Sequence, residues 1–236
     1  MNGTVAPVVA AELAQRGWEA VGWDRTKVST DDYSVVEGHI LEVRPDAFFH
    51  IGMGSPDWAA WIAIVCQAEK IPLLFTGTVS VYGDGQTGPF SVNDVPVPTD
   101  DYGSYKLGCE GVIQRAYPGA TVARIGWQIG TAPGSNNMVD YLVRTAVDGR
   151  ITLSERWIPG CSLLPDTARV LVDLALGGAA GLYHVDSNPG LSLAEIGRRL
   201  NKKLDLGLEV VSADEPVKNH RMVDPRISIP DISTRI

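Results

Sequence analysis

A tyrosine and a lysine four residues apart, Tyr102 and Lys106, are the residues of this sequence best suited to chemistry. They lie in a stretch that reads as the start of a helix, where this spacing puts both side chains on one face. A phenol near pKa 10 is a poor acid or base at neutral pH, but a neighbouring ammonium group favours the phenolate and lowers that pKa. The pair predicts that Tyr102 exchanges a proton with a substrate oxygen. The alternative is a solvated helix face with the ring packed beneath the lysine stem.

A hydroxyl-bearing segment precedes this helix. The β-rich run 75–83 contains Thr78 and ends in a glycine turn, so it can present a hydroxyl at the end of a strand. Thr78 can alternatively be a β-branched strand residue with a purely structural role. Tyr105 stands beside Lys106 but has no lysine four residues further on, which ranks it well below Tyr102.

The rest of the pattern alternates between strands and helices, which is typical of a parallel, doubly wound α/β sheet. The sequence predicts strands at 19–24, 47–51, 73–76 and 121–125. It predicts helices at 7–16, 39–43, 58–69, 102–115, 138–147 and 193–200. We expect a nucleotide-binding domain at 1–130 and a smaller C-terminal substrate lobe at 131–236. The lobe should pack closely against the domain, and interleaving of the two is left open.

The start of the chain can supply a glycine turn before the first helix. Backbone N–H groups at such a turn suit a phosphate, and Gly3, Thr4 and Val5 are the candidate contacts. A nucleotide-binding sheet normally has an apolar strand before this turn, yet Met1 and Asn2 stand where that strand should end. We therefore expect the first strand to be truncated and the natural start to lie about 5–8 residues upstream, roughly one strand length.

Asp24 follows the glycine turn by about twenty residues, at the end of a predicted strand. A carboxylate there can accept hydrogen bonds from both ribose hydroxyls of an adenosine, which favours NAD. Arg25 could instead hold a 2′-phosphate, so NADP stays open, and the two residues can also be a solvated turn pair. Gly52 and Gly54 follow Ile51 at the end of a later strand and would let the backbone approach the middle of the cofactor, with Ile51 and Gly52 as the candidate contacts. The alternative for these glycines is loop flexibility.

Together these segments resemble the extended short-chain dehydrogenase/reductase family, which pairs a Ser or Thr before Val-Tyr-Gly with Tyr-x-x-x-Lys. The resemblance implies a Rossmann-like NAD(P)-binding fold and hydride transfer between nicotinamide and a sugar carbonyl, with Tyr102 protonating the developing alkoxide. It implies that Lys106 lowers the pKa of Tyr102 and bonds the nicotinamide ribose. It also implies that Thr78, with Ser80 as the fallback, bonds the same substrate oxygen.

Within that family the chain is most similar to dTDP-4-dehydrorhamnose reductases and their sugar-nucleotide-binding relatives. Trp127 resembles their substrate-facing tryptophan, although a buried core indole is equally common. The resemblance implies further substrate contacts for Asn137 and Arg221, and it places Arg226 in a late basic segment near the nucleotide diphosphate. It therefore implies reduction of a nucleotide-linked 4-keto sugar. The arginines can also belong to a solvated surface.

Two other functions stay open on the same scaffold: an NAD-dependent nucleotide-sugar epimerase, and a noncatalytic subunit that binds a nucleotide-sugar or NAD(P). The family's dehydratases have Asp-Glu after the catalytic threonine, because elimination needs a further acid and base. Val79 and Ser80 stand there in this chain, which disfavours dehydration.

Composition sets further limits. The chain has 236 residues, 44% of them hydrophobic, and a formal net charge of −8, which disfavours nonspecific nucleic-acid binding. No apolar run reaches the ~18 residues of a membrane span, and the N-terminus lacks the pattern of a secretory signal. Three scattered cysteines, and His50, His184 and His220, show no metal-ligand spacing. We expect a cytoplasmic enzyme without a metal, and a homodimer is left open.

Overall fold

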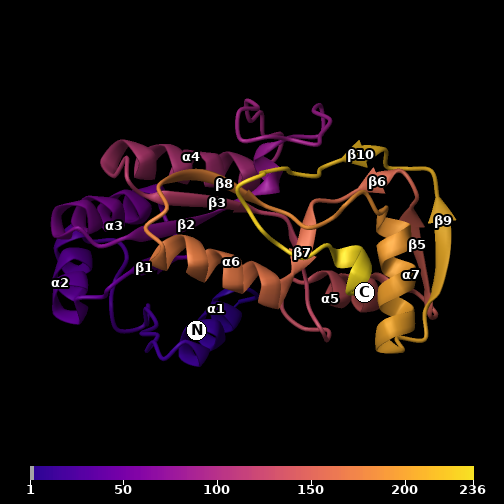
Figure 1. Cartoon of the computed structure of the whole chain (residues 1–236), viewed down its shortest axis with the longest axis horizontal. Coiled ribbons are helices and arrows are strands. Elements are labelled where there is room, and N and C mark those ends of the chain that lie inside the picture. Colours follow the sequence, from indigo (N-terminus) through magenta and orange to yellow (C-terminus); the bar gives the residue numbers. More distant parts are fainter. Residues whose placement is uncertain (1–2) are drawn as a thin grey trace.

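A parallel sheet forms the centre of the computed structural model, which describes residues 3–236 (Figure 1). The strand order is β1-β2-β3-β8, and each neighbouring pair runs parallel. The strands are β1 (Phe48–His50), β2 (Leu73–Thr78), β3 (Thr121–Ile125) and β8 (Gly181–Val185). β2 is buried along its whole length, as expected for a parallel strand covered on both faces.

Helices cover both faces of this sheet (Figure 1). One layer consists of α2 (Tyr33–Val43), α3 (Pro56–Glu69) and α4 (Asp101–Ala116), and the other of α1 (Ala6–Gln15) and α6 (Leu164–Leu176). Side chains of β2 alternate between the layers, because successive strand residues point to opposite faces. Leu73 and Phe75 pack in the first layer and Leu74 in the second. The predicted doubly wound α/β sheet is confirmed.

The predicted strand at 19–24 is wrong, because this segment is irregular in the structure. Within residues 3–236, β1 is the edge strand of the sheet, and 19–24 forms no ladder with its free side. Its side chains pack on helices and loops instead, Ala20 beside the α1 and α6 layer and Trp23 against Trp58. The truncated first strand falls on residues 1–2, outside the described part of the chain.

A smaller lobe lies beside the sheet (Figure 1). It contains α5 (Met138–Thr145), α7 (Leu193–Leu204) and the short helical turn η2 (Ile232–Thr234). Its parallel two-stranded ribbons are β4 (Trp127–Ile129) with β7 (Cys161–Leu163), β5 (Arg150–Ser154) with β9 (Glu209–Ala213), and β6 (Trp157–Ile158) with β10 (Lys218–Asn219). A separate apolar core supports this lobe, including Leu142 of α5, Leu153 of β5 and Leu200 of α7.

The chain passes repeatedly between the sheet and the lobe. After β7 it returns to supply α6 and β8, and a predicted division at residue 130 therefore separates these two elements from the sheet to which they belong. The segment after β10 runs back over the sheet and returns to end beside α7 (Figure 1). On the way it bonds to the loop before α4, where Gly88 N donates to Asn219 O and Phe90 N to Arg221 O, both at 2.7 Å.

None of the helices in the described part of the chain combines the length and the apolar character needed to cross a membrane.

Candidate active site

A cleft of about 1460 Å³ opens at the carboxyl ends of β1, β2 and β3, the edge at which ligands bind to open α/β sheets. It brings together candidates from distant parts of the sequence. The predicted cofactor and catalytic residues that line it, with Trp127, are Gly3, Thr4, Val5, Asp24, Arg25, Ile51, Gly52, Thr78, Ser80, Tyr102 and Lys106.

Tyr102 and Thr78 meet where α4 begins. The N-cap Asp100 accepts a hydrogen bond from Gly103 N at 2.6 Å and fixes the first turn of the helix, which contains Tyr102. Thr78 ends β2, and its Oγ1 accepts from Ser80 N at 3.2 Å. The Tyr102 ring is 43% exposed. Partial burial raises the pKa of Tyr102, while a hydrogen bond with the Thr78 side chain lowers it to a smaller extent.

Lys106 lies deeper than Tyr102. Its side chain is only 3% exposed, Nζ donates to Thr76 O at 2.9 Å, and Nζ lies 4.6 Å from the centre of the Phe75 ring. Burial lowers the pKa of Lys106 to about 8. The expected lowering of the Tyr102 pKa by Lys106 is not met, because the pKa of Tyr102 is raised and its own burial is the main cause.

One helical turn after Lys106, Glu110 forms a buried ion pair with Arg124 of β3. Arg124 donates to Glu110 Oε2 at 2.8 Å, and the two side chains are 4% and 3% exposed. A Cβ at position 77 would clash with the Glu110 carboxylate, so Gly77 in β2 leaves the space that the pair occupies. The pair holds α4, and with it Lys106, against the sheet.

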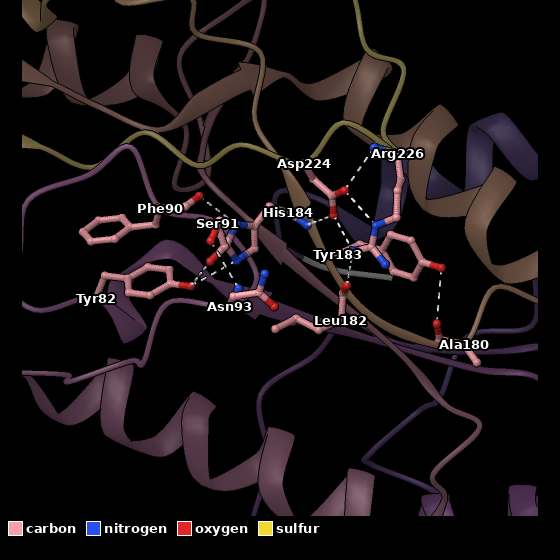
Figure 2. Close-up of polar contacts among 10 residues, drawn as sticks. All are labelled: Tyr82, Phe90, Ser91, Asn93, Ala180, Leu182, Tyr183, His184, Asp224 and Arg226. Carbon is pink, nitrogen blue, oxygen red and sulfur yellow. Dashed lines mark hydrogen bonds and ion pairs between the residues drawn. The ribbon is translucent and has the colours of Figure 1, made fainter.

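The ion pair continues into a buried polar network around Tyr82 (Figure 2). Arg124 donates to Tyr82 Oη at 2.8 Å, and Oη lies 3.2 Å from His184 Nε2. His184 Nδ1 lies 3.1 Å from Phe90 O, and a carbonyl can only accept, so Nδ1 carries the proton. Tyr82 Oη therefore shares its one proton between His184 Nε2 and Ser91 O, each at 3.2 Å. Burial lowers the pKa of His184 to about 4 and keeps the ring neutral. The network fixes the Val-Tyr-Gly turn that follows Thr78.

The glycine turn can hold an anionic group. Gly3 has φ +90° with open space beside it, a conformation that favours glycine. Within residues 3–236 no side chain caps α1 at its N-cap Val5. Pro7 in the first turn has no N–H, and Val8 N donates to Val5 O at 3.1 Å, so a phosphate would bind the N–H groups that precede Pro7. Thr4 Oγ1 accepts from Asn136 N at 3.0 Å and lies 2.9 Å from Ser135 Oγ. A lobe loop therefore contacts the turn, and the two together fit a diphosphate.

Asp24 and Arg25 lie at the same cleft but are already engaged. Asp24 Oδ1 accepts from Thr26 Oγ1 at 2.6 Å and from Thr26 N at 3.0 Å, and these bonds lower the pKa of Asp24. Arg25 stacks over Trp58 at 4.8 Å and donates to Met53 O. Both side chains are exposed, so a nucleotide ribose could approach either one.

Only one of the three predicted substrate contacts, Trp127, lines the cleft. Its ring is stacked near-parallel to Trp157 at 6.1 Å. Asn137 is buried at the start of α5, where its Oδ1 caps the helix by accepting from Asp140 N. Arg221 lines a smaller pocket with Asp186. Because Asn137 serves as a cap and Arg221 lies in another pocket, their substrate contacts stay predictions.

Arg226 is not among the residues that line the cleft, and its contact near the nucleotide diphosphate stays a prediction. Its guanidinium pairs with Asp224 at 2.7 Å and donates to Leu182 O at 2.6 Å, and it stacks over Tyr183 (Figure 2). Asp224 also accepts from His184 N. These contacts fasten the segment after β10 to β8.

Sequence reasoning missed several residues that line the cleft, namely His50, Gln128, Trp157 and His220. His50 packs between Trp58 and Phe75, and burial lowers its pKa to about 3. Gln128 directly follows the predicted substrate contact Trp127, and this position in the sequence could have identified it. His50 ends β1 and directly precedes Ile51, whereas Trp157 and His220 are isolated in sequence and reach the cleft through the topology of the lobe. The described residues contain no group of three His, Cys, Asp or Glu that could hold a metal ion.

A family model described as the RmlD substrate binding domain matches residues 57–228. No relative among the curated proteins matches the sequence. Among solved structures, dTDP-4-dehydrorhamnose reductase from Bacillus anthracis str. Ames in complex with NADP has a TM-score of 0.82 and 17% identity, with 98% of this chain and 92% of that chain covered.

Two further solved structures share the fold. The Bordetella bronchiseptica enzyme WbmH in complex with NAD+ has a TM-score of 0.78 and 16% identity, with coverage of 98% of this chain and 92% of that chain. UDP-N-acetylglucosamine 4-epimerase from Bacillus cereus has a TM-score of 0.72 and 18% identity, with coverage of 95% and 88%. At these identities the likeness establishes the fold.

Proposed function

The chain belongs to the RmlD substrate binding domain family, and we propose that it is an NAD(P)-dependent reductase of a nucleotide-linked 4-keto sugar, similar to dTDP-4-dehydrorhamnose reductase. One observation carries the proposal. Thr78, Tyr102 and Lys106 line the same cleft as the glycine turn and Asp24. The similar structures from Bacillus anthracis and Bordetella bronchiseptica contain NADP and NAD+, which supports a nicotinamide dinucleotide as the cofactor.

The residues of the cleft suit such a cofactor. The N-terminus of α1 with Gly3 and Thr4 would hold the diphosphate, and Asp24 or Arg25 the adenosine ribose. Lys106 would bond the nicotinamide ribose. A bound NADH or NADPH would supply the hydride.

Tyr102 suits the role of general acid in the direction of reduction. The phenol is protonated at neutral pH and can donate its proton to the alkoxide oxygen that develops at the sugar carbonyl, because an alkoxide is a stronger base than a phenolate. The raised pKa of Tyr102 makes the phenol a weaker acid than an unshifted tyrosine. Thr78 can donate a second hydrogen bond to that oxygen, which stabilises its negative charge. Lys106, with a pKa of about 8, carries most of its charge at neutral pH, close to the same strand end.

An epimerase is the second candidate, because the Bacillus cereus epimerase shares the fold at a similar identity. An epimerase would return the hydride to the sugar, so it would consume no NADH overall. A binding subunit would hold the cofactor or the sugar nucleotide without turnover.

The test is incubation of the protein with NADH or NADPH and a panel of dTDP- and UDP-linked 4-keto sugars. Absorbance follows the reduced nicotinamide, and NMR gives the stereochemistry of the product. Stoichiometric oxidation with a new alcohol supports the reductase. A second incubation with NAD+ and UDP-glucose tests the epimerase, which inverts the C4 hydroxyl without net reduction of NAD+. Binding without turnover in either incubation would indicate the subunit. A cytoplasmic location and a homodimer remain part of this proposal, to be checked by fractionation and light scattering.

A further inference from the structure

The wall of the cleft that the lobe supplies contains polar atoms left without partners. Gln128 Oε1, Trp157 Nε1 and His220 Nε2 are each buried, and within residues 3–236 none has a hydrogen-bond partner. All three residues line the cleft. Buried polar groups are nearly always paired in folded proteins, because an unpaired group loses its bonds to water. The Gln128 side chain lies on the Ser162 side of β4, opposite Trp127, which stacks on Trp157. The three atoms thus come from two sides of β4 to one cleft, where a ligand would complete their hydrogen bonds.

Gln128 is the most firmly placed of the three. Its side chain is 4% exposed, and it lies on β4, which pairs with β7. Nε2 donates to Gly126 O at 3.0 Å. This bond fixes the orientation of the amide, because the flipped form would set two oxygens against each other. Oε1 is therefore a buried acceptor that receives no hydrogen bond within residues 3–236.

Trp157 and His220 add different hydrogen-bonding properties. The indole Nε1–H of Trp157 can only donate, and its ring is stacked near-parallel to Trp127. His220 follows β10, and its backbone N–H donates to Ile158 O at 2.8 Å, which places the residue beside the Trp157 strand. Burial lowers the pKa of His220 and keeps the ring neutral at pH 7, so its ring nitrogens can donate or accept depending on the tautomer.

We propose that Gln128, Trp157 and His220 bind the hydroxyl groups of the sugar and determine which sugar the cleft accepts, an inference that rests on the proposed function. A hydroxyl both donates and accepts, which matches one fixed acceptor, one fixed donor and one group that can do either. All three side chains are uncharged as placed. The neighbouring cation Lys218 is paired with Asp84 at 2.6 Å, so this wall favours a neutral hydroxyl over a phosphate.

The reacting sugar is the part of the ligand that must come near this wall. Trp127 and Gln128 directly follow β3, which lies beside β2 with Thr78 paired to Ile125. The hydroxyl-bearing strand end and the lobe wall therefore start from neighbouring strands of one sheet. A sugar whose carbonyl meets Thr78 and Tyr102 can present its remaining hydroxyls to Gln128.

The experiment measures binding rather than turnover. Calorimetry gives the affinity of the whole chain for dTDP-glucose and for analogues that each lack one sugar hydroxyl, with dTDP as the reference. We expect the wild-type protein to lose roughly 10-fold or more in affinity for at least one analogue, because an unpaired buried acceptor is costly. Gln128→Met keeps the size of the side chain and removes the acceptor, so it should abolish that difference while the affinity for dTDP stays unchanged.

Gln114→Met, at an exposed position of α4, is the matched control and should behave as wild type. Trp157→Phe and His220→Phe should each weaken discrimination against a deoxy analogue in the same way. Equal losses for dTDP and for every sugar in Gln128→Met would overturn the inference, since they would indicate recognition of the base or a general loss of structure. A melting temperature within a few degrees of wild type excludes unfolding as the cause.

These results separate the specificity inference from the reductase proposal. Hydroxyl discrimination that depends on Gln128, without any oxidation of NADH, supports the inference and contradicts the reductase. Turnover of a 4-keto sugar, together with unchanged discrimination in Gln128→Met, supports the reductase and overturns the inference. Absence of binding to every sugar nucleotide overturns the inference as well.

Discussion

Tyr102 is the residue on which the proposed acid role most directly depends. Tyr102→Phe removes the phenolic proton and keeps the ring, so we expect kcat to fall by roughly 10²-fold or more, as is usual for a lost general acid. Cofactor affinity should change little. Steady-state kinetics and NADH titration measure the two quantities. Tyr33→Phe, at an exposed tyrosine of α2, is the control. Near wild-type turnover in Tyr102→Phe would remove Tyr102 from the mechanism.

Lys106 gives a prediction about stability and pH. Its pKa is about 8 in the folded protein and 10.5 in the unfolded reference. Between these values the unfolded chain holds a proton that the folded chain has released, so stability should rise with pH across this range. Below pH 8 both states are protonated and the cost of burying the charge is complete.

Lys106→Met removes this titration. Relative to the variant, wild type should gain up to about 3 kcal/mol in free energy of unfolding between pH 8 and pH 10.5, since one pKa unit corresponds to about 1.4 kcal/mol. Urea unfolding of both proteins across this range measures the difference, and the other titrating groups cancel in it. Parallel curves for the two proteins would contradict the assigned pKa.

The candidate site could be predicted from sequence only where its residues are close in the chain. Tyr102 and Lys106 share one helix, and Thr78 stands at a strand end with a recognisable turn after it. Gln128 and His220, by contrast, reach the cleft through pairing of β4 with β7 and of β10 with β6. Such pairings join segments 30 or more residues apart and leave no periodic signal.

At the scale of elements, the approach of α4 to the turn after β2 controls how Tyr102 meets Thr78. Gly103 lies directly against Ser80 O, and a Cβ there would clash with this backbone oxygen. Gly103→Ala should therefore push the start of α4 away from the turn. We expect a loss of about 1–3 kcal/mol in stability, typical of overpacking, and a lower kcat.

Gly108→Ala is the matched control in the same helix, because the space beside Gly108 is open. Alanine favours a helix by about 1 kcal/mol over glycine, so this variant should be slightly more stable and fully active. Thermal unfolding and turnover of the two variants test the difference. Equal behaviour of the two alanines would mean that the α4 contact with the turn is not tight.

Some helices and strands could be predicted from the sequence and others could not. α3, α4 and β3 were predicted within two residues at each end, because apolar spacing and local caps determine them. α6 was missed although it has a proline in its first turn, Asp166 as a first-turn acid and Gly177 at its C-cap; only the N-cap side chain is absent. The segment 19–24 has the composition of a strand, but within residues 3–236 it does not pair with the free edge of β1.

At the scale of the whole molecule, the sheet and the lobe are joined by a chain that crosses between them. α6 and β8 come from within the lobe sequence, and the segment after β10 lies across the sheet. Because each unit needs segments from both halves of the chain, we expect the two to unfold together. A single calorimetric transition with equal calorimetric and van't Hoff enthalpies would be the signature of that coupling.

Asp186 hydrogen-bonds to three of the segments that meet where the chain crosses between the sheet and the lobe. It follows β8, and its carboxylate accepts from the backbone N–H groups of Cys161, Asn188 and Met222 at 3.0, 2.9 and 2.7 Å. These three partners lie on the β7 ribbon, on the loop that enters α7 and on the segment after β10. One side chain thus supplies acceptors to three segments that meet between the sheet and the lobe.

Asp186→Ala should therefore destabilise the whole molecule rather than one unit. Three partly buried N–H groups lose their acceptor. Burial raises the pKa of Asp186 to about 7, so the carboxyl is only partly ionised at neutral pH, and each bond contributes between about 0.5 kcal/mol for a neutral acceptor and about 3 kcal/mol for a charged one. With some replacement by water, we expect a loss of at least about 2 kcal/mol, or roughly 5 °C in Tm for a chain of this size. Asp46→Ala, at an exposed aspartate after α2, should stay within about 0.5 kcal/mol of wild type. Calorimetry of wild type, Asp186→Ala and Asp46→Ala gives the Tm and the number of unfolding transitions of each protein. If the transition of Asp186→Ala splits in two, the carboxylate couples the units without setting their individual stability, whereas an unchanged Tm would show that the three segments are held by their other contacts.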